Sequence, residues 1–109
     1  MIYCFDLDGT LCRMVLDGNY SNAEPYMDRI QKVNSLYDSG HTIYIETARG
    51  TESGVDWNEA TKHQLREWGV KYHKLRAGIK FAATYYIDDR AVHVDDFFDK
   101  EYKETYRRP

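Results

Sequence analysis

The chain has 109 residues, 42% of them apolar, and its 15 basic and 18 acidic side chains give a net charge of -3. This composition predicts one globular domain spanning residues 1–109, and it excludes intrinsic disorder, which requires low hydrophobicity and high net charge. Small basic clusters occur at 71–80 and 107–108, but the acidic balance does not support a nucleic-acid partner. No apolar stretch approaches the ~20 residues of a membrane span, so we expect a cytoplasmic protein with no membrane contact.

The first predicted element is a β-strand at residues 2–5, which are apolar and β-prone and run directly into Asp6. Such a run is typical of a strand buried on both faces. We therefore expect Cys4 to be a buried free thiol. Cys4 and Cys12 lack the spacing of a zinc site.

The middle of the chain predicts two helices and a second strand. Residues 9–24 are rich in turn formers and indicate a loop or small hairpin. A helix begins at Pro25 and ends at Gly40, with apolar residues every three or four positions. A strand at 41–45 leads into a polar loop at 46–50, and a helix at 57–68 follows the capping pair formed by Asp56 and Glu59.

Three further elements are expected toward the end of the chain. Residues 70–75 suggest a short third strand, and residues 84–87 form the clearest later strand because they are aromatic and β-branched. Phe97, Phe98, Tyr102 and Tyr106 recur at spacings that suit one apolar stripe on a C-terminal helix. This stripe either folds back on the sheet or joins copies of the chain into a homo-oligomer.

Strands that alternate with helices predict an α/β fold, a three-layer sandwich with a parallel Rossmann-like sheet. Ligands bind at the carboxyl ends of the strands in such sheets. Three predicted strands deliver polar residues to this edge, namely Asp6 and Asp8, Thr47 and Arg49, and Asp88 and Asp89.

The chemistry of these residues suits phosphate and a hard cation. Carboxylates crowded around one point repel unless a cation offsets them, and a set of oxygen ligands favours Mg²⁺. The hydroxyl of Thr47 and the ammonium of Lys80 can hold the oxygens of a transferring phosphoryl group, and Asp6 can act as a nucleophile. Arg49 either binds a substrate anion or pairs with a nearby glutamate, Glu46 or Glu52.

The sequence Asp6-Leu7-Asp8-Gly9-Thr10 after an apolar strand resembles the first motif of the haloacid dehalogenase (HAD) superfamily. Thr47, Lys80 and the pair Asp88-Asp89 resemble its later motifs in the same order. The segments 47–50, 64–70 and 86–91 are also similar to small HAD-type hydrolases found among capsule and polysaccharide biosynthesis proteins. Those relatives usually have a Gly-Lys-Pro sequence before the last strand, whereas this chain has Gly78-Ile79-Lys80-Phe81.

The resemblance implies a Mg²⁺-dependent phosphatase that acts through an aspartyl phosphate on Asp6. Asp8 would protonate the leaving oxygen and then activate water, and Thr47, Arg49 and Lys80 would bind the substrate. The metal ligands implied are Asp6, Asp8 through its backbone carbonyl, Asp88 directly, and Asp89, which either binds through water or supports the other ligands. The short connections leave no room for a cap domain, so the site is expected to be open and to suit a sugar phosphate or another large phosphomonoester, or to be closed over by a neighbouring subunit. A nucleotide and a polynucleotide end also remain open as substrates.

Two other functional classes remain open on this sequence. A phosphoacceptor receiver domain also has paired acids, a threonine and a lysine at one sheet edge, but there the lysine follows the threonine near the end with no second acidic pair. A catalytically silent HAD-like binding module is the other alternative, and the intact Asp6 and Asp8 argue against it. Repeated release of phosphate would distinguish an enzyme from both.

Overall fold

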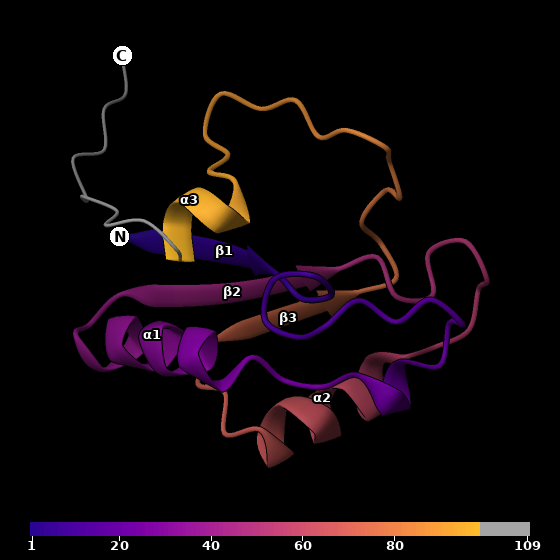
Figure 1. Cartoon of the computed structure of the whole chain (residues 1–109), viewed down its shortest axis with the longest axis horizontal. Helices are drawn as coiled ribbons and strands as arrows, with labels where there is room; N and C mark the ends of the chain where they lie inside the picture. Colours follow the sequence, from indigo (N-terminus) through magenta and orange to yellow (C-terminus); the bar gives the residue numbers. More distant parts are fainter. Residues whose placement is uncertain (99–109) are drawn as a thin grey trace.

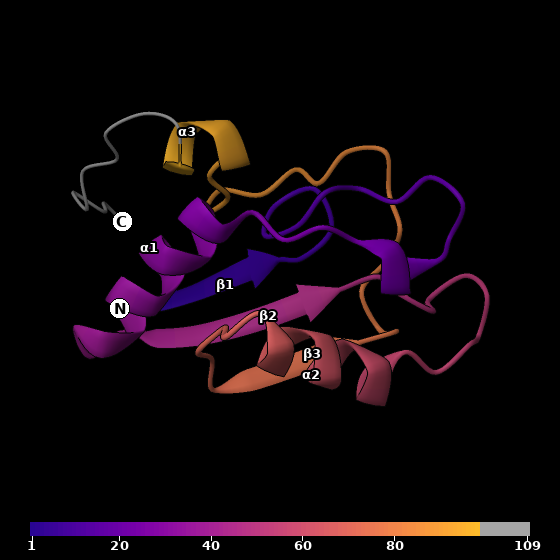
Figure 2. The same ribbon diagram turned by 60° about the horizontal axis from the view of Figure 1, so that its bottom comes forward.

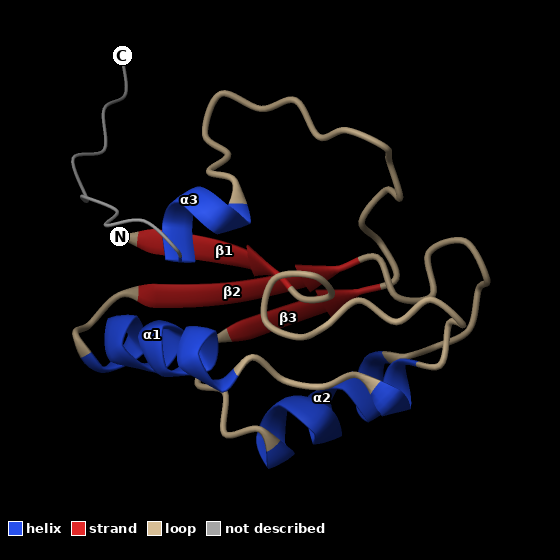
Figure 3. Ribbon diagram, in the orientation of Figure 1, coloured by secondary structure: helices blue, strands red, loops and turns tan. Residues whose placement is uncertain are grey.

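The centre of the molecule is a sheet of three parallel strands in the order β1-β2-β3, seen in a computed structural model that describes residues 1–98 (Figures 1 and 3). The strands are β1 (Ile2–Asp6), β2 (Thr42–Thr47) and β3 (Lys74–Ala77). Each connection contains a helix, as parallel neighbours require. The α/β class and the parallel sheet are therefore confirmed, and β3 lies a few residues later than expected.

Four helical segments accompany the sheet. They are a 3-10 turn, η1 (Tyr20–Asn22), and the α-helices α1 (Met27–Asp38), α2 (Asn58–Glu67) and α3 (Val94–Phe98). The two helices predicted from periodic apolar residues are confirmed as α1 and α2, since Ile30 and Val33 of α1 and Leu65 of α2 are buried. No helix within residues 1–98 has the length and apolar character needed to cross a membrane.

The sheet buries one face and exposes the other. Phe5, Ile43 and Ile45 lie in the core, whereas Cys4 and Lys74 on the opposite face are exposed. The predictions that the first strand is buried on both faces and that Cys4 is a buried thiol are therefore wrong. The reason is that side chains alternate between the two faces of a strand, and the helices within residues 1–98 cover only one face of the sheet. The described part of the chain therefore has two layers rather than the three that were expected.

The strand predicted at residues 84–87 is not formed, and β1 is an edge strand of the sheet that residues 1–98 build. Tyr85 and Ile87 are exposed, and the backbone from 79 to 93 runs as a loop beyond the sheet (Figure 1). The Tyr86 hydroxyl instead donates to the carbonyl of Phe81 and accepts from the N–H of Ala83. Local contacts thus replace a strand ladder, because β propensity depends on context.

The last described helix, α3, folds back beside α1, as Figure 2 shows. Phe97 is buried against the rings of Tyr3 and Phe5, and its carbonyl accepts a hydrogen bond from Lys32 Nζ at 2.7 Å. The first half of the predicted apolar stripe therefore packs on the chain's own sheet. Tyr102 and Tyr106 lie outside the described residues.

Phe97→Ala should lower the free energy of unfolding by about 3 kcal/mol, because it removes a buried ring and leaves a cavity between α3 and β1. Urea denaturation followed by circular dichroism would measure the change. The matched control is Phe81→Ala, since the Phe81 side chain is exposed. Equal effects of the two substitutions would contradict the packing of α3 on the sheet.

Candidate active site

The loop after β1 is wound around the carbonyl of Leu7, which fixes the positions of Asp6 and Asp8. The backbone N–H groups of Thr10, Leu11 and Cys12 point to that oxygen with N···O distances of 3.1, 2.8 and 3.3 Å. Leu7 itself is fully buried. Asp6 at the end of β1 and Asp8 in the loop after it therefore lie on either side of a buried core residue.

A pocket of about 260 Å³ opens at the carboxyl end of β1 and β2. Its walls include five of the seven predicted site residues, which come from segments up to 74 positions apart. These five are Asp6, Asp8, Thr47, Arg49 and Lys80, and Tyr20 and Tyr86 are among the other residues that line the pocket. The expected meeting of polar residues at one edge of the sheet is thus present for those at the ends of β1 and β2 and for Lys80.

Asp6 and Lys80 form an ion pair at the pocket, with 3.3 Å between Oδ1 and Nζ. Partial burial raises the pKa of Asp6, and the Lys80 ammonium lowers it by a smaller amount. The ring of Tyr86 lies 4.5 Å from Lys80 Nζ, a cation–π contact that holds the ammonium over the pocket. Lys80 thus lies beside Asp6 although the residue after it is Phe81 rather than proline.

Asp8 accepts hydrogen bonds on both carboxylate oxygens. Arg49 donates from Nε to Oδ2 at 2.9 Å and from Nη2 to Oδ1 at 2.8 Å, a bidentate ion pair. The Thr47 hydroxyl lies 3.4 Å from Oδ2, and the Cys12 thiol lies 3.4 Å from Oδ1. Burial and the neighbouring Asp8 raise the pKa of Cys12 to about 12, so this thiol remains a donor to the carboxylate.

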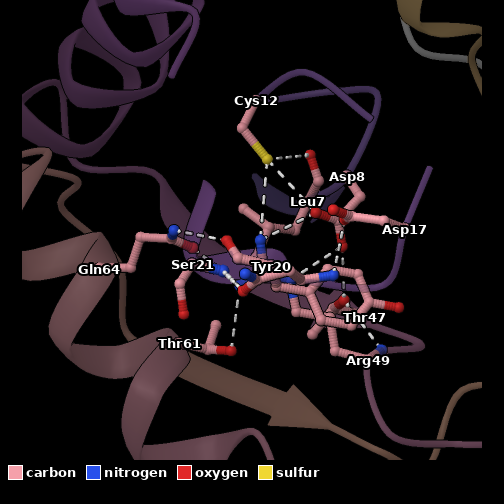
Figure 4. A network of polar contacts seen from close by, with 11 residues as sticks. Leu7, Asp8, Cys12, Asp17, Tyr20, Ser21, Thr47, Arg49, Thr61 and Gln64 are labelled. Atoms are coloured by element: carbon pink, nitrogen blue, oxygen red, sulfur yellow. Dashed lines mark hydrogen bonds and ion pairs between the residues drawn. The ribbon is translucent and has the colours of Figure 1, made fainter. Parts of the chain in front are cut away.

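Arg49 is 2% exposed and lies at the centre of a polar network (Figure 4). Besides Asp8, it donates from Nη1 to the Thr61 hydroxyl at 3.3 Å and to Gln64 Oε1 at 2.8 Å. The Cys12 sulfur lies 3.9 Å from Nη2. The interpretation that Arg49 pairs with Glu46 or Glu52 is wrong, because Asp8 is its acidic partner.

Gln64 and Tyr20 are among the residues of this network that had no predicted role. Gln64 donates from Nε2 to the carbonyl of Tyr20 at 2.9 Å, and the Tyr20 ring lies 4.7 Å from the Arg49 guanidinium. A signal for Gln64 was its place at the start of segment 64–70, which carries part of the family resemblance, whereas Tyr20 is one of ten tyrosines and had no distinguishing signal. Their importance follows from the approach of α2 and the 9–24 loop to the same arginine.

Asp88 and Asp89 lie in the exposed loop after β3 and are not part of the pocket wall. The predicted convergence of four carboxylates is therefore wrong for this arrangement, since the strand that should carry this pair is not formed. Within residues 1–98, no three acidic, histidine or cysteine side chains are grouped as metal ligands. Asp6 is an oxygen ligand of the right type for Mg²⁺, and Arg49 binds only the carboxylate of Asp8, whose implied metal ligand is its backbone carbonyl. Because Asp88 and Asp89 lie outside the pocket wall, the described arrangement is not a complete magnesium site.

Asp6→Asn should raise thermal stability at neutral pH relative to the wild type. The folded chain binds the Asp6 proton more tightly than the unfolded chain does, so wild-type stability falls as pH rises from the ordinary to the raised pKa. The side chain is 41% exposed, so we expect a shift below the ~4 °C that 1 kcal/mol represents. Thermal melts of both proteins between about pH 3 and about pH 8 would measure this difference in melting temperature.

The control for this experiment is Glu52→Gln, which neutralises an exposed carboxylate outside the pocket. Its melting temperature should follow that of the wild type across the same range. A stability difference between the wild type and Asp6→Asn that is constant with pH would contradict the raised pKa of Asp6.

Comparison with known proteins gives two structural neighbours. A protein from Vibrio cholerae, solved as an MCSG target, is 27% identical with a TM-score of 0.79 over 90% of this chain and 87% of its own. A chain in the structure of a Pnkp1/Rnl/Hen1 complex is 18% identical with a TM-score of 0.57, over 96% of this chain and 35% of that one. No family model and no curated protein matches the sequence.

Proposed function

We propose that the pocket hydrolyses a phosphomonoester, with Asp6 as the nucleophile, and that the chain is a small capless enzyme of the HAD type. The observation that carries the proposal is the grouping of Asp6, Lys80 and Thr47 in one pocket. A carboxylate beside an ammonium and a hydroxyl supplies an attacking oxygen together with donors for phosphoryl oxygens. The 27% identity to the Vibrio cholerae protein over most of both chains supports the fold behind this site.

The first step transfers the phosphoryl group to the protein. An Asp6 oxygen forms a bond to phosphorus, the bond from phosphorus to the leaving oxygen breaks, and that oxygen takes a proton from Asp8. Lys80 Nζ, 3.3 Å from Asp6 Oδ1, is placed to bind a phosphoryl oxygen and to keep the nucleophile ionised. The Thr47 hydroxyl is the second donor to the phosphoryl group.

The second step releases phosphate. A water molecule forms a bond to phosphorus and gives a proton to Asp8, while the bond from phosphorus to Asp6 breaks. Asp8 ends the cycle protonated and ready for the next leaving group. The contacts of Thr47 and Cys12 with Asp8, both 3.4 Å, are the ones that yield when Asp8 carries a proton, because a hydroxyl and a thiol rotate freely.

We also propose that the reaction depends on Mg²⁺, an expectation that comes from the resemblance. This part of the proposal concerns the loop after β3, because that loop carries Asp88 and Asp89. The metal would supply positive charge to the phosphoryl oxygens when bound, and the residues at the pocket that would hold it are Asp6, through its carboxylate, and Asp8, through its backbone carbonyl. A site that also includes Asp88 or Asp89 requires the part of this loop that carries them to approach Asp6. No step above depends on that movement.

The enzyme assay is release of phosphate from a panel of phosphomonoesters that includes sugar phosphates, with Mg²⁺ or with a chelator. Asp6→Asn should abolish turnover because an amide does not attack phosphorus, while circular dichroism shows an unchanged fold. Asp8→Asn should reduce the rate about 10²- to 10⁴-fold, the contribution typical of general acid–base catalysis. Phosphate incorporated once per chain without turnover would indicate a receiver-like protein instead.

A separate measurement tests the metal. Titration with Mg²⁺ should be detectable by calorimetry and should weaken at least tenfold in Asp88→Asn or Asp89→Asn, the lower end of the loss expected when a metal site loses a supporting group. Asp95→Asn, which neutralises an exposed carboxylate on α3, is the control. Equal activity with Mg²⁺ and with chelator would contradict the metal requirement without affecting Asp6.

A further inference from the structure

We infer that Arg49 is a positioning residue that holds the carboxylate of Asp8, and that it does not bind the substrate. The inference rests on the proposed function for its catalytic consequence, but its geometry is independent of that function. It replaces the expectation from the sequence that Arg49 contacts the phosphate. The evidence is that each N–H donor of the Arg49 guanidinium already has a partner within the protein.

A guanidinium carries five N–H donors in a fixed plane. In Arg49, the Nε donor and one Nη2 donor bind Asp8, and the two Nη1 donors meet Thr61 and Gln64. The remaining Nη2 donor is directed to the Cys12 sulfur at 3.9 Å. A phosphate that bound Arg49 would have to break one of these contacts, and it would compete with the charge of Asp8.

The surroundings of Arg49 fix the plane of its guanidinium. Thr61 is fully buried on α2, and Gln64 on the same helix is tied in turn to the carbonyl of Tyr20. Gly50 follows Arg49 with φ +85°, and a Cβ there would lie 2.1 Å from the carbonyl oxygen of Val55. The backbone turn at Gly50 and the helix α2 therefore set the guanidinium before any ligand arrives.

The consequence for catalysis concerns the orientation of Asp8. A bidentate partner defines the plane of a carboxylate, whereas Thr47 and Cys12 lie farther away and their protons rotate. Arg49 therefore sets where Asp8 delivers a proton to the leaving oxygen. A lysine at this position keeps the charge but lacks the planar fork, so the charge remains and the orientation is lost.

The first test separates positioning from substrate binding by steady-state kinetics. Arg49→Lys should lower kcat about 10²-fold on an alkyl phosphate, the loss expected for a group displaced by ~1 Å, with KM unchanged. The loss should be much smaller on para-nitrophenyl phosphate, whose leaving group needs little protonation. In the Asp8→Asn background, Arg49→Lys should cause no further loss, because there is no carboxylate left to position.

Two further variants keep the test decisive if Arg49→Lys does not fold. Gln64→Leu removes one support of the guanidinium and should show the same dependence on the leaving group with a smaller loss, while Gln64→Glu should restore activity because it still offers an acceptor to Nη1. Arg66→Met, an exposed arginine on the same helix, is the matched control and should leave kcat unchanged. An equal loss on both substrates, or a rise in KM, would overturn the inference.

A measurement without turnover keeps this inference separate from the proposed function. The Nε–H resonance of Arg49 in nuclear magnetic resonance spectra should shift in Asp8→Asn and stay in place when inorganic phosphate is added to the wild type. A shift with phosphate would show that Arg49 contacts the ligand and would overturn the inference. If the chain lacks phosphatase activity on every substrate but the resonance responds only to Asp8, the proposed function fails and the positioning contact stands.

Discussion

The ion pair between Asp8 and Arg49 is the contact on which the arrangement of the pocket depends. Burying two charges is costly, and the cost is offset when the geometry is good and every remaining donor is paired. Arg49 meets this condition through Thr61 and Gln64 of α2. The same contacts join the loop after β1, the loop after β2 and α2 through one buried side chain.

Asp6 is in a different environment, although it lies two residues from Asp8. Its carboxylate is partly exposed and bound by a lysine that comes from a loop. Desolvation exceeds the effect of that lysine and raises the pKa of Asp6. In the proposed reaction, the accessible and incompletely neutralised carboxylate of Asp6 is the attacking group, and the carboxylate of Asp8, held on both oxygens, is the fixed partner for a proton.

The loop between β3 and α3 contributes to the site in a way that strand pairing does not. Lys80 enters the pocket from it, and the Tyr86 ring covers the ammonium. The same loop leaves Asp88 and Asp89 in solvent, while β1 keeps an unpaired edge within residues 1–98. The lysine and the second acidic pair are therefore separated in space, although eight positions separate Lys80 from Asp88 in sequence.

Much of the fold and part of the site follow from the sequence alone. Periodic apolar residues determined α1 and α2, and apolar runs that end in polar residues determined β1 and β2, because these patterns reflect local geometry. The placement of Asp6, Asp8 and Thr47 at one edge followed from the parallel sheet. Tertiary structure decided the exposed face that bears Cys4, the missing strand at 84–87 and the partner of Arg49, because each depends on which distant surface is available to pack or pair.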